Sequence, residues 1–181
     1  MMPIDFIGIS ISISGGYMIH EVKGDILLSH AQVIAHGVAP NDQFDRGFAL
    51  SLREQWPAMV KDFHHFCHVM QPKSGEVWVW SGGMSKHIVN LLTQEAARSQ
   101  GTRSGRARIE YVNHALQELR YLLENDKFAS LALPRLATGA GGLEWHMVRP
   151  LVERHLGDLA KPIYIYTHYQ KGVQAIEPKP E

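Results

Sequence analysis

The fold of this chain is decided by residues 134–145, which read Pro-Arg-Leu-Ala-Thr-Gly-Ala-Gly-Gly-Leu-Glu-Trp. The run Ser130–Leu133 before them is typical of a buried strand, and Glu144–Leu156 after them has the pattern of a helix. Glycines between a strand and a helix expose successive backbone N–H groups at the positive helix end, where phosphate groups bind. The stretch lacks the ending of a Walker loop, and its glycines do not have the spacing of the dinucleotide fingerprint. A diphosphate cradle and a tight structural turn both remain open at this point.

The residues on either side indicate an α/β fold. Short apolar, β-branched or aromatic runs alternate with amphipathic stretches, as expected when helices cover both faces of a sheet. Proline lacks a backbone N–H and restricts the residue before it, so Trp56-Pro57 should separate two helices. We predict six strands, at Ile19–Val22, Val33–Val38, Glu76–Trp80, Ile88–Leu92, Ser130–Leu133 and Ile163–Thr167. We predict four helices, at Phe48–Trp56, Ala58–Val69, Arg106–Asp126 and Glu144–Leu156.

The composition indicates one domain without a strong overall electrostatic field. A chain of 181 residues with 45% hydrophobic content can form a single core. Lys and Arg total 18, as do Asp and Glu, so a charged ligand has to be recognised locally. No apolar run approaches the roughly 20 residues of a membrane span, and the one cysteine, Cys67, suits a reducing compartment. We expect a cytoplasmic monomer with no membrane partner, no metal and no organic cofactor.

The two ends are predicted to lie outside the domain, which we assign to residues 18–169. Residues 1–17 lack the basic start and cleavage site of a signal peptide, and a second methionine, Met18, follows them. We interpret them as an N-terminal extension. Residues 170–181 contain two prolines, two lysines and two glutamates with little to bury, which predicts a flexible tail.

Two further segments are candidates for ligand contacts. In Lys23-Gly24-Asp25-Ile26 the glycine allows a turn at the end of an early strand, and the carboxylate after it can accept hydrogen bonds from an amino group. The segment from Ile34 to Ala49 runs from a strand through a polar loop to a helix start, and its loop could supply a second set of amides. An ordinary turn and an ordinary surface loop are the competing interpretations.

These three segments, in this order and with Ile88–Gln94 between them, resemble the macrodomain family over about residues 18–168. The resemblance implies a three-layer α/β/α fold with a central mixed, mainly parallel sheet of about six strands, and an ADP-ribose cleft at the strand ends. It implies that Asp25 holds the adenine amine, that Ile26 lines the adenine site and that Tyr166 borders it. It assigns the diphosphate and the distal ribose to Arg46, Gly47, Ala137, Thr138, Gly139, Ala140, Gly141, Gly142 and Leu143.

Within the family, the chain most resembles the branch that removes ADP-ribose from glutamate or from DNA bases. That branch uses a lysine after the Asn-Leu-Leu-Thr strand and, in some members, an aspartate in the second glycine loop. Here these positions are Gln94 and Gly141. The glutamine amide cannot form a Schiff base with an opened ribose, and glycine cannot act as an acid or a base. An enzyme would therefore have to rely on Asp45 or His36 to activate water, with Gln94 on a ribose hydroxyl.

Several functions remain open on this sequence. The chain could bind and hydrolyse ADP-ribose derivatives, including the 1″-phosphate, or it could read ADP-ribosylated protein or nucleic acid without chemistry. The segment Arg98–Arg108 holds four arginines and no acidic residue, so an RNA-associated module is a third option, although the absence of stacking aromatics favours a solvated loop. His64 and His68 share one helical face, but without further ligands we interpret them as part of an exposed helix.

Overall fold

A mixed six-stranded sheet organises the computed structural model, which describes residues 18–83, 85–99, 101–125 and 128–179. The strand order is β1-β6-β5-β2-β4-β3, and every neighbouring pair is parallel except β3 and β4. The strands are β1 (Ile19–Gly24), β2 (Val33–Val38), β3 (Val77–Ser81), β4 (His87–Leu92), β5 (Leu131–Pro134) and β6 (Ile163–Tyr169). This arrangement confirms the predicted mixed, mainly parallel sheet.

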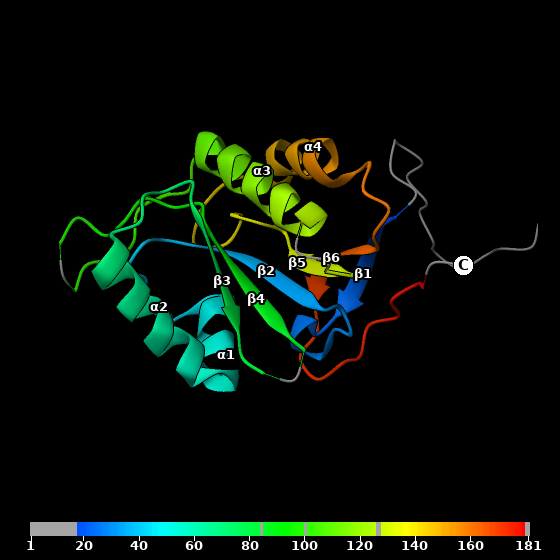
Figure 1. The fold of residues 1–181 in the computed structure, drawn as a ribbon, viewed down its shortest axis with the longest axis horizontal. Coiled ribbons are helices and arrows are strands. Elements are labelled where there is room, and N and C mark those ends of the chain that lie inside the picture. The colour runs from blue at the N-terminus through cyan, green and yellow to red at the C-terminus, as the bar shows by residue number, and fades with distance from the viewer. Residues whose placement is uncertain (1–17, 84, 100, 126–127, 180–181) are drawn as a thin grey trace, which may run out of the picture.

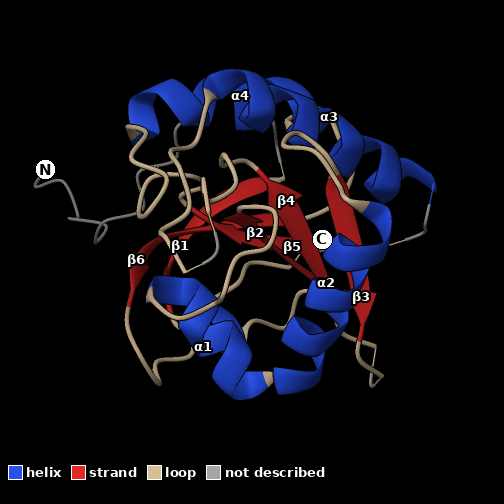
Figure 2. Cartoon of the chain, turned by 90° about the vertical axis from the view of Figure 1, so that its left-hand side faces the viewer, coloured by secondary structure: helices blue, strands red, loops and turns tan. Residues whose placement is uncertain are grey.

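Helices cover both faces of the sheet, which gives the three predicted layers (Figures 1 and 2). On one face lie α3 (Ile109–Asn125) and α4 (Trp145–Leu156), and on the other lie α1 (Gly47–Gln55) and α2 (Pro57–Met70). The central strand β2 is therefore buried on both sides, and its residues Val33, Ile34 and Ala35 are fully buried. A continuous apolar run is what a parallel strand covered on both faces requires.

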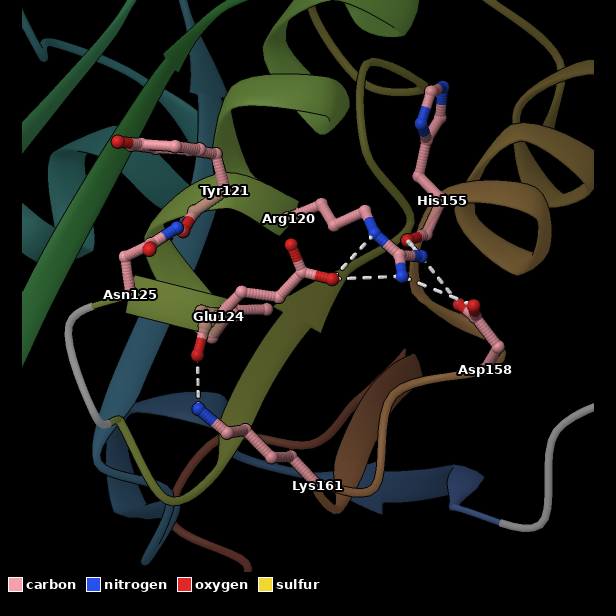
Figure 3. Close-up of polar contacts among 8 residues, drawn as sticks. Arg120, Tyr121, Glu124, Asn125, His155, Asp158 and Lys161 are labelled. Carbon is pink, nitrogen blue, oxygen red and sulfur yellow. Dashed lines mark hydrogen bonds and ion pairs between the residues drawn. The ribbon is translucent and has the colours of Figure 1, made fainter.

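A polar network joins α3 to the segment that follows α4 (Figure 3). The guanidinium of Arg120 pairs with Glu124 one turn later and with Asp158, and it also donates to the carbonyl oxygen of His155. Lys161 donates to the carbonyl oxygen of Leu123 near the end of α3. Hydrogen bonding to Asp158 raises the pKa of Arg120, and the same contact lowers the pKa of Asp158. Glu124 and Asp158 are exposed and Arg120 is half-buried, so water screens both ion pairs and each contributes little to stability.

The segment after β6 differs from the flexible tail that its composition predicts. Residues 170–179 run back across the sheet face that carries α1 and α2, below β1 and β6 (the red segment in Figure 1). Ala175 is buried there, and the carboxylate of Glu177 accepts hydrogen bonds from the hydroxyls of Ser29 and Tyr166 and from the His30 amide. The tail thus covers part of the sheet that no helix covers. Its packing depends on this uncovered face, so the composition of the tail alone could not predict it.

Two further sequence predictions bear on the chain ends and the membrane. The predicted N-terminal extension, residues 1–17, lies outside the described residues. Among the helices of the described ranges, none combines the length and the apolar character needed to cross a bilayer.

Candidate ligand-binding site

The parallel strands bring the candidate segments to one edge of the sheet. The loops that follow β1, β2, β4, β5 and β6 all leave from the carboxyl ends of parallel strands. Figure 2 views the molecule from the side on which the segment between β4 and α3 projects in Figure 1. Ligands of open α/β sheets bind in the crevice outside this edge. The loops after β2 and β5 are neighbours there, because β2 pairs with β5.

The glycine loop, residues 135–143, is a tight turn with unused donors. Ala137 has a φ of 61°, its carbonyl oxygen accepts from the Leu143 amide at 3.0 Å, and the Gly142 amide donates to Gly139 at 3.1 Å. These bonds close the loop and turn its middle outward. Within the described residues, no hydrogen-bond acceptor serves the backbone N–H groups of Thr138, Gly139, Ala140 and Gly141. Gly139 and Ala140 are exposed, Thr138 is half-buried and Gly141 is buried. A run of free amides of this kind is suited to a phosphate group.

Gly141 has a structural reason to be glycine. A Cβ built on it would lie 2.6 Å from the carbonyl oxygen of Ala137 and 2.8 Å from the Cβ of Ala107. The carbonyl oxygen of Gly141 also accepts from the Ala107 amide at 3.0 Å, which holds the two segments together. The backbone therefore leaves no room for the aspartate that some macrodomains carry here. Gly139, in contrast, has open space where a side chain would project.

The loop between β2 and α1 offers a second set of free amides. Phe44, with a φ of 53°, is fully buried and anchors the loop, and its amide donates to Asp42 at 2.8 Å. Helix α1 then begins at Gly47. No acceptor among the described residues engages the N–H groups of residues 47–49. Asp45 and Arg46 are exposed beside this helix end and form no ion pair with the described side chains. The loop thus combines a positive helix end with a free guanidinium.

His36 does not reach the cleft, contrary to our hypothesis that it activates water. Its side chain is 2% exposed, packs against the rings of Phe44 and Phe48, and bonds through Nε2 to Oδ1 of Asn90 at 2.6 Å. Burial lowers the pKa of His36 to about 4, against the opposing influence of Asn90 and Asp42, so the ring is neutral at pH 7. Its role is to fill the core below the loop.

Gln94 lies at the end of β4 and is bonded to its own loop. The side chain is 5% exposed, and its Nε2 donates to the carbonyl oxygen of Gly105 at 3.1 Å. Next to it, the hydroxyl of Thr93 is buried and has no hydrogen-bond partner among the described residues. A Cβ at Gly37 would lie 2.6 Å from this hydroxyl, so a glycine is required for the close approach of β2 and the Thr93 side chain.

The loop after β1 presents a carboxylate. Asp25 is 6% exposed and accepts from the amides of Leu27 at 3.0 Å and Gly172 at 2.9 Å. Each carboxylate oxygen can accept a further bond. Ile26 is 2% exposed and belongs to the core. No described acceptor engages the Ile26 amide.

Tyr166, which the resemblance places at the adenine border, is instead buried under the tail, where its hydroxyl donates to Glu177. Sequence reasoning missed Tyr169, which pairs with Gly24 next to Asp25 and is 51% exposed. Desolvation, together with the charges of Asp25 and Glu54, raises the pKa of Tyr169. The two-residue period of β6 could have identified it only if the strand had been predicted to extend past Thr167.

Comparisons with known proteins agree on one fold. No family model matches the chain. A DNA ADP-ribosyl transferase–DNA ADP-ribosyl glycohydrolase fusion protein of Thermosipho africanus is 26% identical over 172 residues, which are 88% of this chain and 44% of that protein. The DNA ADP-ribosyl glycohydrolase of Mycobacterium tuberculosis is 25% identical over 166 residues, 88% of this chain and 46% of that protein. The chain thus spans less than half the length of these curated relatives.

Solved structures extend the likeness to the backbone. The macrodomain of Thermus aquaticus DarG has a TM-score of 0.71 and 23% identity, covering 83% of this chain and 98% of that one. The macrodomain of Mycobacterium tuberculosis DarG has a TM-score of 0.70 and 25% identity, covering 81% and 97%. Thermosipho africanus DarTG in complex with ADP-ribose has a TM-score of 0.73 and 21% identity, covering 90% and 44%. The solved macrodomains and the arrangement of the loops thus agree that the chain has the macrodomain fold, as its resemblance to that family implies.

Proposed function

We propose that this domain binds ADP-ribose along the edge formed by the carboxyl ends of the parallel strands. The observation that carries the proposal is the pair of free amide sets, residues 47–49 and 138–141, on loops that follow two neighbouring strands. A diphosphate between them would accept hydrogen bonds from both sides, and the exposed guanidinium of Arg46 would add an opposite charge. The chain has no net charge, so this local arrangement supplies the attraction.

We assign the remaining parts of the ligand from the order of the strands. We assign the adenine to the β1–β6 end, with its amine on the carboxylate of Asp25, its ring on Tyr169 and a ring nitrogen on the Ile26 amide. An exposed tyrosine beside a buried carboxylate offers both stacking and hydrogen bonding to a base. The distal ribose would then lie towards β4 and Gln94. A relative with the same fold was solved in complex with ADP-ribose, which supports this ligand.

Calorimetric titration with ADP-ribose tests the proposal, with AMP as a ligand that lacks the diphosphate and the distal ribose. The matched variants are Gly139→Glu and Gly139→Gln, which are equal in size and differ in charge. Both side chains have space, so the fold should be kept. We expect the glutamate to weaken binding at least about tenfold more than the glutamine, because its charge opposes the diphosphate. Absence of binding by the unsubstituted protein, or equal affinities of the two variants, would refute the proposal.

We also propose that the domain hydrolyses the bond between ADP-ribose and its carrier. Both curated relatives above are named for DNA ADP-ribosyl glycohydrolase activity, which supports this reaction class. The lysine route is closed, because Gln94 has no nucleophilic amine. We assign water activation to Asp45, an exposed carboxylate next to the free amides and without an ionic partner among the described side chains.

Release of ADP-ribose from an ADP-ribosylated oligonucleotide or an ADP-ribosylated glutamate peptide measures this activity. Asp45→Asn should abolish release and leave the affinity for ADP-ribose within about twofold, since the amide keeps the size and removes the base. Unchanged release in Asp45→Asn would exclude this residue. Binding without any release by the unsubstituted protein would make the domain a reader of modified macromolecules.

We further propose that the domain acts as a monomer in the cytoplasm. The only cysteine, Cys67, is buried, and burial raises the pKa of its thiol, so it offers no reactive group for an intermolecular disulfide. Light scattering after size exclusion tests the monomeric state, and the mass of a dimer would contradict it.

A further inference from the structure

The segment between β4 and α3 carries positive charge that the proposed ligand does not use. We call residues 95–99 and 101–108 the arginine loop. Figure 1 shows this segment projecting from the carboxyl edge of the sheet beyond α2. Arg98, Arg103 and Arg106 are exposed, and none pairs with a carboxylate in the described part of the chain. Arg108 differs, because its Nε binds Oε1 of Glu95 at 2.5 Å.

The arginine loop is fastened to the proposed diphosphate site on both sides. The Ser104 hydroxyl donates to Asp42 at 3.0 Å, in the loop after β2. The Ala107 amide donates to Gly141 at 3.0 Å, in the loop after β5. Gln94 holds the Gly105 carbonyl from the end of β4. None of these bonds uses an arginine side chain, so the guanidinium groups are positioned by the loop and remain free.

The strand order tells which end of the ligand faces this loop. Asp25 lies at the β1–β6 side of the sheet, whereas the arginine loop follows β4, on the far side of β2. A ligand with its adenine at Asp25 therefore directs its distal ribose towards the arginine loop. Any macromolecule that carries the ADP-ribose is attached at that ribose. The carrier has to leave the cleft beside Arg98, Arg103 and Arg106.

The surface next to Gln94 leaves space for such a carrier. A depression of about 470 Å³ lies between the end of α2, the loop after β2 and the arginine loop, and its lining includes Asn41, Gln71, Lys73 and Ala96. The Ser74 hydroxyl at its margin donates to the carbonyl oxygen of Gln94 at 2.8 Å. The depression thus adjoins the position that we assign to the distal ribose.

We infer that the arginine loop binds the phosphate backbone of a nucleic acid strand that carries the ADP-ribose. Arginine is suited to phosphate because its planar guanidinium donates two parallel hydrogen bonds. The arginine loop has no aromatic residue on which bases could stack, so its contacts are with the backbone and do not depend on sequence. This inference rests on the proposed ADP-ribose site for the direction of the ligand.

The test compares two triple variants that remove the same charge. Arg98→Gln/Arg103→Gln/Arg106→Gln neutralises the arginine loop. Lys61→Gln/Arg154→Gln/Lys179→Gln neutralises three exposed side chains on α2, α4 and the tail. Binding of an ADP-ribosylated single-stranded oligonucleotide and of its unmodified form is measured by fluorescence anisotropy over a range of salt concentrations. Free ADP-ribose is titrated in parallel.

We expect the loop variant to bind both oligonucleotides more weakly and to bind free ADP-ribose within about twofold of the unsubstituted protein. Three lost phosphate contacts should reduce the slope of log affinity against log salt by about 2 for a single strand. The control triple should keep both the affinity and the slope. Equal losses in the two triples, or an unchanged slope in the loop variant, would overturn the inference.

Two arms separate this inference from the proposed function and from another partner. If free ADP-ribose does not bind but the unmodified oligonucleotide shows the expected loss in the loop variant, the proposed cleft fails and the backbone contact stands. If an ADP-ribosylated acidic peptide depends on the three arginines and the oligonucleotides do not, the carrier is a protein and the inference is wrong.

Discussion

Acidification should destabilise this protein through one buried side chain, His36. Burial lowers its pKa from 6.5 to about 4 in the folded state. Between these two values the unfolded chain binds a proton at this residue and the folded chain does not, so the free energy of unfolding falls as the pH falls. A difference of roughly 2.5 units at ~1.36 kcal/mol per unit corresponds to about 3 kcal/mol, lost progressively below pH 6.5 and complete below pH 4.

Urea unfolding at a series of pH values measures this loss, and His36→Gln isolates it. The glutamine amide does not titrate and can still donate to Oδ1 of Asn90, so the variant should lose less stability than the unsubstituted protein over the same interval. Burial also lowers the pKa of His155, but that residue is present in both proteins and its contribution cancels. Parallel pH profiles of the two proteins would refute the reasoning.

Three further predictions concern packing, the adenine end and the α3–α4 network. Gly141→Asp should lower the free energy of unfolding by about 2 kcal/mol, because its Cβ would meet the Ala137 carbonyl, whereas Gly139→Ala should change it little. Chemical denaturation measures both values, and an unchanged stability of Gly141→Asp would contradict the prediction. Tyr169→Ala should weaken ADP-ribose binding about tenfold by loss of stacking, while Tyr166→Phe should leave calorimetric affinity unchanged and cost about 1 kcal/mol of stability. A double-mutant cycle on Arg120 and Asp158 should give a weak coupling that decreases with salt, and a strong, salt-independent coupling would contradict the exposed position of Asp158.

The elements of the fold are largely predictable because their apolar periods match their structure. Val33–Val38 is predicted with the bounds that the structure has. The third long helix is predicted from Arg106 but begins at Ile109. The reason lies outside the segment, since the Arg106 carbonyl accepts from Glu95 and Ala107 donates to Gly141. Tertiary contacts of this kind set the ends of an element, and local periodicity does not contain them.

The candidate site is less predictable because it depends on which face of a strand is covered. Tyr164 and Tyr166 share the face of β6 on which the tail lies, so a segment predicted to be flexible decides that Tyr166 is buried. His36 is inaccessible because Phe44 turns back over it from the next loop. In both cases the deciding contact comes from a loop or tail. Such segments lack the hydrophobic periodicity from which helices and strands are predicted, so their path could not be predicted from the sequence.

The pairing of β1 with β6 has a consequence for the order of folding. β1 is the first described strand, and within the described sheet its neighbour is the last one. The register joins Ile19 to Ile163, so nearly the whole chain has to be synthesised before this pair can form. Contacts that close so long a loop are slow, because the entropy of closure precedes any gain from the contact. During translation, β1 therefore waits with an unpaired edge, and β2, β3 and β4 can assemble before it is protected.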